Sequence, residues 1–297
     1  MFEGCYVAMV TDFKNGQVNL DGAKALTRKL IDGGVSGLVP AGCTGEAATL
    51  SPKERLDLLK AVMAERGAKK TVKVVPGTGT NSTASTIELT RAAEDAGADA
   101  ALIITPYYNK PTQAGLIKHY EVVASKVKLP IMVYNVPGRT AVNMLPETVA
   151  EIAKIENIVA IKEASGSVDQ VSRIASLSDI EILSGDDSLT LPMLVVGARG
   201  VVSVAANVVP DTLSIMVRLF REGKIADARQ IHVDLLPLFH VLFIETSPGP
   251  VKAALEMLGA GTGELRLPLV PVAEATRQKV RRVLEDLGLL GNRTVID

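Results

Sequence analysis

Short apolar segments alternate with longer amphipathic segments along most of this chain. Each apolar segment is four or five residues long, a length typical of a strand that is buried on both faces. The pattern predicts eight strands, at residues 6–10, 37–40, 72–76, 100–104, 131–134, 158–162, 181–184 and 200–204.

Apolar residues recur at helical spacing in the segments between these strands. Ser51 and Glu54, for example, form a capping-box pattern that starts a helix, with apolar residues following one turn apart. Seven helices are predicted between the strands, at 21–32, 52–66, 82–96, 113–127, 146–155, 169–177 and 188–196. Four more are predicted after the last strand, at 211–221, 225–243, 250–258 and 272–287.

This alternation predicts an α/β protein with an all-parallel sheet. Eight strand–helix units in about 200 residues fit a closed (β/α)8 TIM barrel. An open doubly wound sheet is the alternative, but it requires a glycine-rich dinucleotide fingerprint that residues 12–16 lack. We therefore expect a barrel carrying the active site over residues 1–210 and a C-terminal helical region over residues 211–297.

The strand at 158–162 is apolar until its last residue, Lys162. Lysine is rarely buried, because removing an ammonium group from water is costly. Burial favours the neutral amine, which is the form that reacts with a ketone to give an imine. The alternative is that the strand ends at Ile161 and that Lys162 simply reaches water.

Other distinctive residues lie at the carboxyl ends of the strands, where barrel enzymes carry their active sites. Tyr107 and Tyr108 follow the fourth strand, Tyr134 ends the fifth, and Arg139 comes shortly after it. Each of these residues has a structural alternative, as a packed core ring or a solvated surface group. Their convergence nevertheless favours a catalytic role for Lys162, with Arg139 suited to hold a carboxylate.

The composition narrows the class of protein. Lys and Arg number 32 and Asp and Glu 33, so the charge gives no reason to expect a nucleic acid or a membrane as partner. Cys5 and Cys43 form no recognisable disulfide framework, and residues 1–4 lack the basic start of a signal peptide. The most apolar region, 189–210, is interrupted by proline and polar residues. We expect a soluble cytoplasmic protein.

A metal or phosphate site is not expected. Asp186 and Asp187 follow the seventh strand and could ligate a metal, but the three histidines all lie on predicted helices. Two acids would also repel a phosphate, and residues 77–79 are interpreted as a plain turn. The residues thus predict a cofactor-free aldolase in which Lys162 forms an imine with a 2-oxo acid and Tyr134 transfers protons.

Three motifs in combination resemble the dihydrodipicolinate synthase/N-acetylneuraminate lyase family of class I pyruvate aldolases. They are Gly42-x-Thr44-Gly45-Glu46, Tyr134-Asn135-Val136-Pro137 and Ile161-Lys162-Glu163. The resemblance covers nearly the whole chain, from Phe2 to Pro268. Residues 105–111, 138–140 and 183–187 are most similar to the synthase branch of that family.

The resemblance implies a set of pyruvate-binding residues. Lys162 would form the imine with pyruvate, and Tyr134 would donate and accept protons at the imine carbon. Thr44 and neighbouring backbone N–H groups would bind the pyruvate carboxylate. Gly185 and Val202 match positions that line the pyruvate pocket.

The resemblance also implies how the second substrate is handled. Arg139 matches an arginine that binds aspartate semialdehyde, and Tyr108 matches a tyrosine that enters the site of a neighbouring subunit. Cys43 stands where the synthases usually have a threonine whose hydroxyl links the two tyrosines, Tyr134 and Tyr108, in a proton relay. The effect of Cys43 on the rate of proton transfer through this relay therefore stays open.

The implied function is condensation of pyruvate with aspartate semialdehyde in lysine biosynthesis, by a homo-oligomer that we expect to be a tetramer. Two alternatives stay open. One is another pyruvate aldolase of the same family, which cleaves N-acetylneuraminate or a 2-keto-3-deoxy sugar acid. The other is a catalytically silent binding protein on the same barrel, which the presence of Lys162, Tyr134 and Arg139 disfavours.

Overall fold

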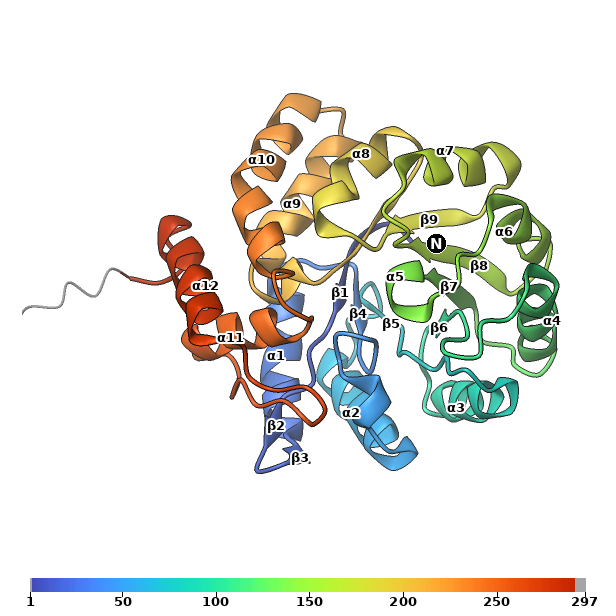
Figure 1. Ribbon diagram of the computed structural model, residues 1–297, viewed down its shortest axis with the longest axis horizontal. Helices are drawn as coiled ribbons and strands as arrows, with labels where there is room; N and C mark the ends of the chain where they lie inside the picture. Colours follow the sequence, from blue (N-terminus) through green and yellow to red (C-terminus); the bar gives the residue numbers. More distant parts are fainter. Residues whose placement is uncertain (1, 292–297) are drawn as a thin grey trace, which may run out of the picture.

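A computed structural model describes residues 2–291 of the chain. Its main sheet has eight parallel strands at the centre of the molecule, with helices around them (Figure 1). The strands are β1 (Gly4–Ala8), β4 (Gly37–Val39), β5 (Lys73–Val74), β6 (Ala101–Ile104), β7 (Ile131–Asn135), β8 (Ile158–Glu163), β9 (Glu181–Ser184) and β10 (Gly200–Ser203). A separate hairpin, β2 (Phe13–Lys14) and β3 (Gln17–Val18), follows β1.

The main sheet closes into a barrel. Its hydrogen-bonded order is β5-β4-β1-β10-β9-β8-β7-β6, which leaves β5 and β6 at the two ends. These ends meet just after β5, where the Thr78 N–H donates to the Leu102 carbonyl (3.0 Å) and the Leu102 N–H donates to the Pro76 carbonyl (2.9 Å). The predicted (β/α)8 barrel is therefore confirmed.

The helices form a layer outside the strands (Figure 1). Those that alternate with the strands are α1 (Leu20–Asp32), α2 (Pro52–Arg66), α3 (Thr83–Asp95), α4 (Gln113–Ala124), α6 (Pro146–Ile152), α7 (Val168–Leu177), α8 (Thr190–Val195) and α9 (Pro210–Arg221). The capping box at the start of α2 is confirmed, because the Ser51 side chain accepts from the Glu54 N–H and the Glu54 carboxylate accepts from the Ser51 N–H. Helices outside and strands inside explain why β7 is buried along its whole length.

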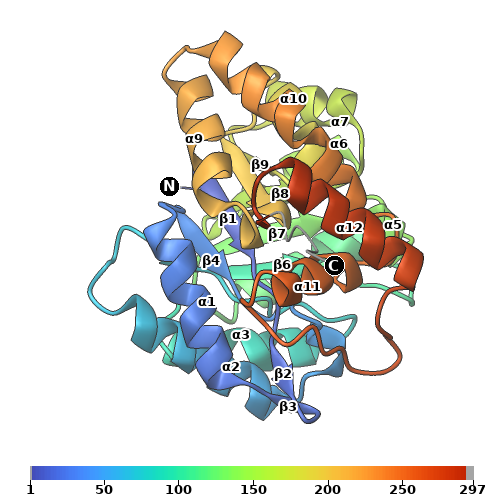
Figure 2. The ribbon, with the colours of Figure 1, turned by 90° about the vertical axis from the view of Figure 1, so that its left-hand side faces the viewer.

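Three further helices complete the described chain: α10 (Ile225–Val241), α11 (Gly249–Met257) and α12 (Glu274–Asp286). α12 packs against α10 and α11 on one side of the molecule (Figure 2). α9 packs against β1 and α1, in the layer around the barrel. The division into units 1–210 and 211–297 remains a prediction, and its last residues, 292–297, lie outside the described part of the chain. Within residues 2–291, no helix has both the length and the apolar character needed to cross a bilayer.

The structure departs from the predicted boundaries at a few places. The helix predicted at 146–155 ends at Ile152, and the segment 188–196 divides into the 3-10 turn η2 (Asp187–Leu189) and α8. Two further 3-10 turns, η1 (Ala47–Thr49) and η3 (Ala205–Asn207), and the single-turn helix α5 (Pro137–Thr140) were not predicted. These elements and the β2–β3 hairpin are too short to produce a periodic pattern.

Candidate active site

Lys162 lies on β8 and is 4% exposed, so the alternative in which it reaches water is wrong. Its Nζ lies 4.3 Å from the ring centroid of Tyr134. It has no hydrogen-bond or ion-pair partner among residues 2–291. Burial lowers the pKa of Lys162 from 10.5 to about 8, although Cys43 and Asp186 act in the opposite direction. At pH 7, about a tenth of this amine is therefore uncharged and nucleophilic.

Tyr134 stands beside Lys162 because their strands pair in register, Tyr134 on β7 with Lys162 on β8. The tyrosine is 6% exposed. Burial raises its pKa, the nearby Cys43 adds to the rise, and Arg139 opposes it. The phenol therefore stays protonated near neutral pH, so its hydroxyl is able both to donate and to accept a hydrogen bond.

Two acids that follow β9, Asp186 and Asp187, act on Lys162 through their charge and have different surroundings. Asp187 is buried and accepts hydrogen bonds from the Ser203 hydroxyl and from the backbone N–H groups of residues 204–205, which ties β9 to the start of η3. Asp186 acts electrostatically on Lys162, and burial raises its own pKa. Within residues 2–291, no three His, Cys, Asp or Glu side chains gather in an arrangement that could hold a metal ion.

Gly185 lies next to Lys162, and Val202 lies on the same face of the sheet. A β-carbon on Gly185 would lie only 3.1 Å from the Lys162 Cε, so the absence of a side chain leaves room for the lysine. Lys162 pairs with Leu183 and Leu183 pairs with Gly200, so these three residues share one face of the sheet. Val202 is two residues beyond Gly200 and is buried on that same face.

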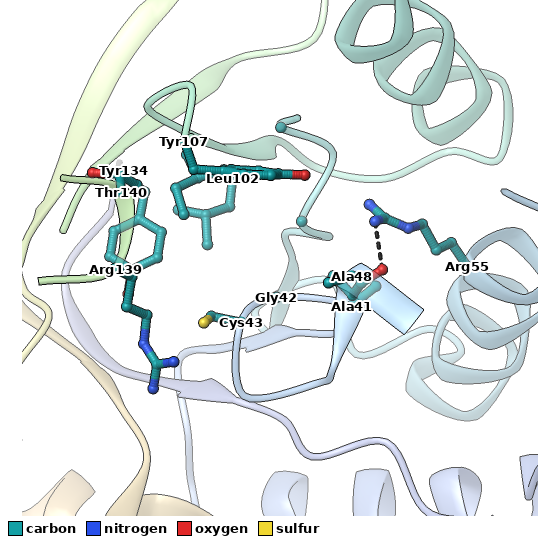
Figure 3. A pocket seen from close by; sticks show the side chains of 14 residues that line it. Ala41, Gly42, Cys43, Ala48, Arg55, Leu102, Tyr107, Tyr134, Arg139 and Thr140 are labelled. Atoms are coloured by element: carbon teal, nitrogen blue, oxygen red, sulfur yellow. Dashed lines mark hydrogen bonds between the residues drawn. The ribbon is translucent and has the colours of Figure 1, made fainter. Parts of the chain in front are cut away.

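The loop after β4 carries Cys43 and Thr44. Cys43 is half-buried, and Figure 3 shows its sulfur on the side of Tyr134 and Arg139. Thr44 is buried. The loop is attached to the strand end of β1, because the Thr11 hydroxyl donates to the Gly45 carbonyl (2.7 Å).

A cavity of about 200 Å³ opens at this end of the barrel (Figure 3). Its lining includes Cys43, Tyr134, Arg139, Arg55 and Tyr107. The remaining predicted site residues, Lys162, Thr44, Gly185 and Val202, are not on its wall. Tyr134 connects the two groups, because it lines the cavity and also contacts the Lys162 amine.

Arg139 belongs to α5, which directly follows the Tyr134 strand. Its side chain is exposed, and its Nη2 donates to the Ser247 carbonyl at 3.4 Å. It lowers the pKa values of Tyr134 and Lys162 through its charge. Arg139 is thus a cation at the cavity wall, within electrostatic range of the candidate nucleophile.

Tyr108 is not brought to this site within one chain. It is 89% exposed and adopts a positive φ of 71°. Tyr107, its neighbour in sequence, lines the cavity instead. Neither Tyr107 nor Arg55 was among the predicted site residues, and Arg55, on α2, becomes part of the cavity only when the barrel closes.

Known proteins match this chain over nearly its whole length. Residues 1–287 match the model of the dihydrodipicolinate synthetase family. The chain is 47% identical to a 4-hydroxy-tetrahydrodipicolinate synthase of Geobacter metallireducens, over 98% of this chain and all of the relative.

Two solved structures extend the likeness to the fold. A dihydrodipicolinate synthase of Thermotoga maritima superimposes with a TM-score of 0.95 at 44% identity, over 98% of this chain and 100% of that one. A chloride-inhibited dihydrodipicolinate synthase of Acinetobacter baumannii, complexed with pyruvate, gives a TM-score of 0.95 at 40% identity, with the same coverage.

Proposed function

The chain belongs to the dihydrodipicolinate synthetase family, and we propose that it acts through an imine on Lys162. The reaction it catalyses is the pyruvate-dependent synthesis of 4-hydroxy-tetrahydrodipicolinate, a lyase reaction of lysine biosynthesis. The second substrate in this proposal is aspartate semialdehyde. The observation that carries it is the buried Lys162 amine, with a pKa of about 8, beside the Tyr134 ring.

The first step joins pyruvate to the enzyme. The neutral Nζ of Lys162 attacks the C2 carbonyl carbon of pyruvate, and loss of water leaves the imine. Tyr134 supplies a proton to the departing oxygen and later recovers one. Thr44 and the adjacent backbone N–H groups hold the pyruvate carboxylate, while Gly185 and Val202 bound the space around C2.

The second step forms the carbon–carbon bond. Loss of a proton from the pyruvate methyl group converts the imine to an enamine, whose carbon attacks the aldehyde of aspartate semialdehyde. Arg139 holds the carboxylate of this substrate by a charge-assisted contact. The substrate amine then attacks C2, the ring closes, and Lys162 leaves as a free amine.

We propose in addition that the active form is a homotetramer in which Tyr108 reaches a neighbouring subunit's site. Support comes from the 89% exposure of this aromatic side chain, beside a site that contains Tyr107 but not Tyr108. Cys43 would connect Tyr108 of one subunit to Tyr134 of another. We also propose that the protein is cytoplasmic.

Parallel assays test the choice of substrate. The purified protein should consume pyruvate when aspartate semialdehyde is added. It should not release pyruvate from N-acetylneuraminate or from a 2-keto-3-deoxy sugar acid. Faster cleavage of either sugar acid than condensation with the semialdehyde would overturn the proposal.

A further inference from the structure

A buried ion pair joins the C-terminal helices to the loop that carries Cys43 and Thr44. The Nζ of Lys252, on α11, lies 2.6 Å from a carboxylate oxygen of Glu46, and their side chains are 2% and 0% exposed. We propose that Lys252 and Glu46 are positioning residues that hold this loop in register with Lys162. The proposal deepens the proposed function, because it rests on the roles given there to Cys43 and Thr44.

The pair is anchored at several points. The Lys252 Nζ also donates to the Thr11 carbonyl at 2.8 Å, and the second Glu46 oxygen accepts from the Arg266 N–H at 3.1 Å. The Phe13 ring lies under both cations, 4.4 Å from the Lys252 Nζ and 4.4 Å from the Arg266 guanidinium carbon. Each of these contacts joins a residue before position 50 to a residue after position 250.

The loop backbone depends on external support. Glu46 has a φ of 53° and a ψ of 37°, in the left-handed region that a side-chain-bearing residue rarely adopts. Its N–H donates to the Cys43 carbonyl at 3.1 Å, so this unusual conformation directly constrains the turn that presents Cys43. Fixing the Glu46 carboxylate therefore fixes the direction of Cys43 and Thr44.

The geometry of this turn matters for the reaction. Cys43 lines the cavity beside Tyr134, and its thiol acts electrostatically on both Tyr134 and Lys162. A displacement of about 1 Å at a reacting site can lower a rate by about 10²-fold. Lys252 touches none of the candidate catalytic side chains, so its influence passes through Glu46.

A second ion pair with a buried cation provides a matched control. The Arg66 Nη1 lies 3.1 Å from an Asp99 oxygen, and the two side chains are 1% and 17% exposed. Asp99 precedes β6 whereas Glu46 follows β4, so the two pairs lie at opposite ends of the parallel barrel. Loss of either pair should cost stability, but only one of them adjoins the active site.

The experiment compares Glu46→Gln with Asp99→Asn, and Lys252→Met with Arg66→Met. Three quantities are measured on each tetramer or other native assembly: thermal stability, kcat/KM for pyruvate, and the rate at which iodoacetamide alkylates Cys43. Cys5 serves as an internal reference, because it is 1% exposed. The amide variants keep the side-chain shape, so they remain informative if the methionine variants do not fold.

We expect Glu46→Gln to lower kcat/KM for pyruvate by about 10- to 100-fold and to speed alkylation of Cys43. Asp99→Asn should leave both quantities near the parent values. Equal effects of the two amide variants, or an unchanged alkylation rate in Glu46→Gln, would overturn the proposal. The alkylation rate needs no substrate, so it tests the positioning even if the assigned reaction is wrong.

Discussion

Two lysines of this protein, Lys162 and Lys252, are buried to a similar degree and have opposite surroundings. They are 4% and 2% exposed, and their Nζ atoms lie 4.3 and 4.4 Å from the centroid of an aromatic ring. Lys252 contacts a carboxylate and a carbonyl oxygen. Lys162 has no such contact with any of the described residues.

The difference shows that burial alone does not make a lysine a nucleophile. Burial lowers the pKa of both amines, but at Lys252 the Glu46 carboxylate opposes the shift through a hydrogen bond and through its charge. At Lys162 the electrostatic influence of Cys43 and Asp186 opposes the shift without any hydrogen bond, and the pKa falls to about 8. One lysine stabilises the fold, and the other is available for reaction.

The largest expected effect is the loss of activity in Lys162→Met. Removal of a covalent nucleophile should lower kcat/KM by roughly 10⁴-fold or more. Steady-state assays with pyruvate and aspartate semialdehyde measure it. If Lys162→Met retains a tenth of the parent activity, Lys162 is not the nucleophile and the contrast between the two lysines is wrong.

The next effect is on stability, and it should differ in sign between the lysines. Lys252→Met leaves a buried carboxylate unpaired and should lower the free energy of unfolding by about 3–5 kcal/mol. Lys162→Met removes an unpaired buried amine and should raise it by about 3 kcal/mol near pH 7.

The sign follows from linkage. Since the pKa of Lys162 is about 8 in the folded chain against 10.5 when exposed, the unfolded state binds more protons between these values. Titration of Lys162 should therefore raise the free energy of unfolding of the parent protein between about pH 8 and pH 10.5, and Lys162→Met should lack this rise. Denaturant titrations at several pH values measure both effects, and destabilisation by Lys162→Met at pH 7 would contradict the account.

Arg139→Ala should impair binding of the second substrate without impairing the reaction with pyruvate. Loss of a charge-assisted contact worth about 1.5–3 kcal/mol should raise KM for aspartate semialdehyde by roughly 10- to 150-fold. Formation of the pyruvate imine should continue. Steady-state kinetics at varied concentrations of aspartate semialdehyde measure the first effect, and borohydride trapping with pyruvate alone measures the second. An unchanged KM for the semialdehyde would show that Arg139 does not bind this substrate.

The pH dependence of imine formation should follow Lys162. With a pKa of about 8, about a tenth of the amine is neutral at pH 7. The rate of imine formation should rise about tenfold from pH 7 and level off above pH 8. Stopped-flow or quenched trapping measures this rate, and a profile still rising steeply at pH 10 would indicate an ordinary lysine.

The smallest expected effect is at Cys43. A thiol is a weaker hydrogen-bond partner than a hydroxyl, so Cys43→Thr should improve the proton relay. A gain of about 0.5–1.5 kcal/mol, the value of one hydrogen bond, corresponds to about a two- to tenfold rise in kcat. Equal kcat values for the parent, Cys43→Thr and Cys43→Ala would mean that protons pass through water instead.

The barrel and the burial of Lys162 were predictable because they depend on local pattern. Each strand is a short apolar run, and in β8 the apolar run stops at a lysine, one residue before the strand ends at Glu163. The pairing of Lys252 with Glu46 was not predictable, because 206 positions separate them and neither belongs to a periodic pattern. Arg55 was not among the predicted site residues for a similar reason, since closure of the barrel places it on the cavity wall.

Borohydride reduction in the presence of pyruvate tests the central claim most directly. Digestion and mass spectrometry would then locate the added pyruvate-derived mass. The account predicts it on the peptide that contains Lys162, and not on the peptide that contains the equally buried Lys252. Trapping on any other lysine, or no trapping with pyruvate bound, would contradict the account.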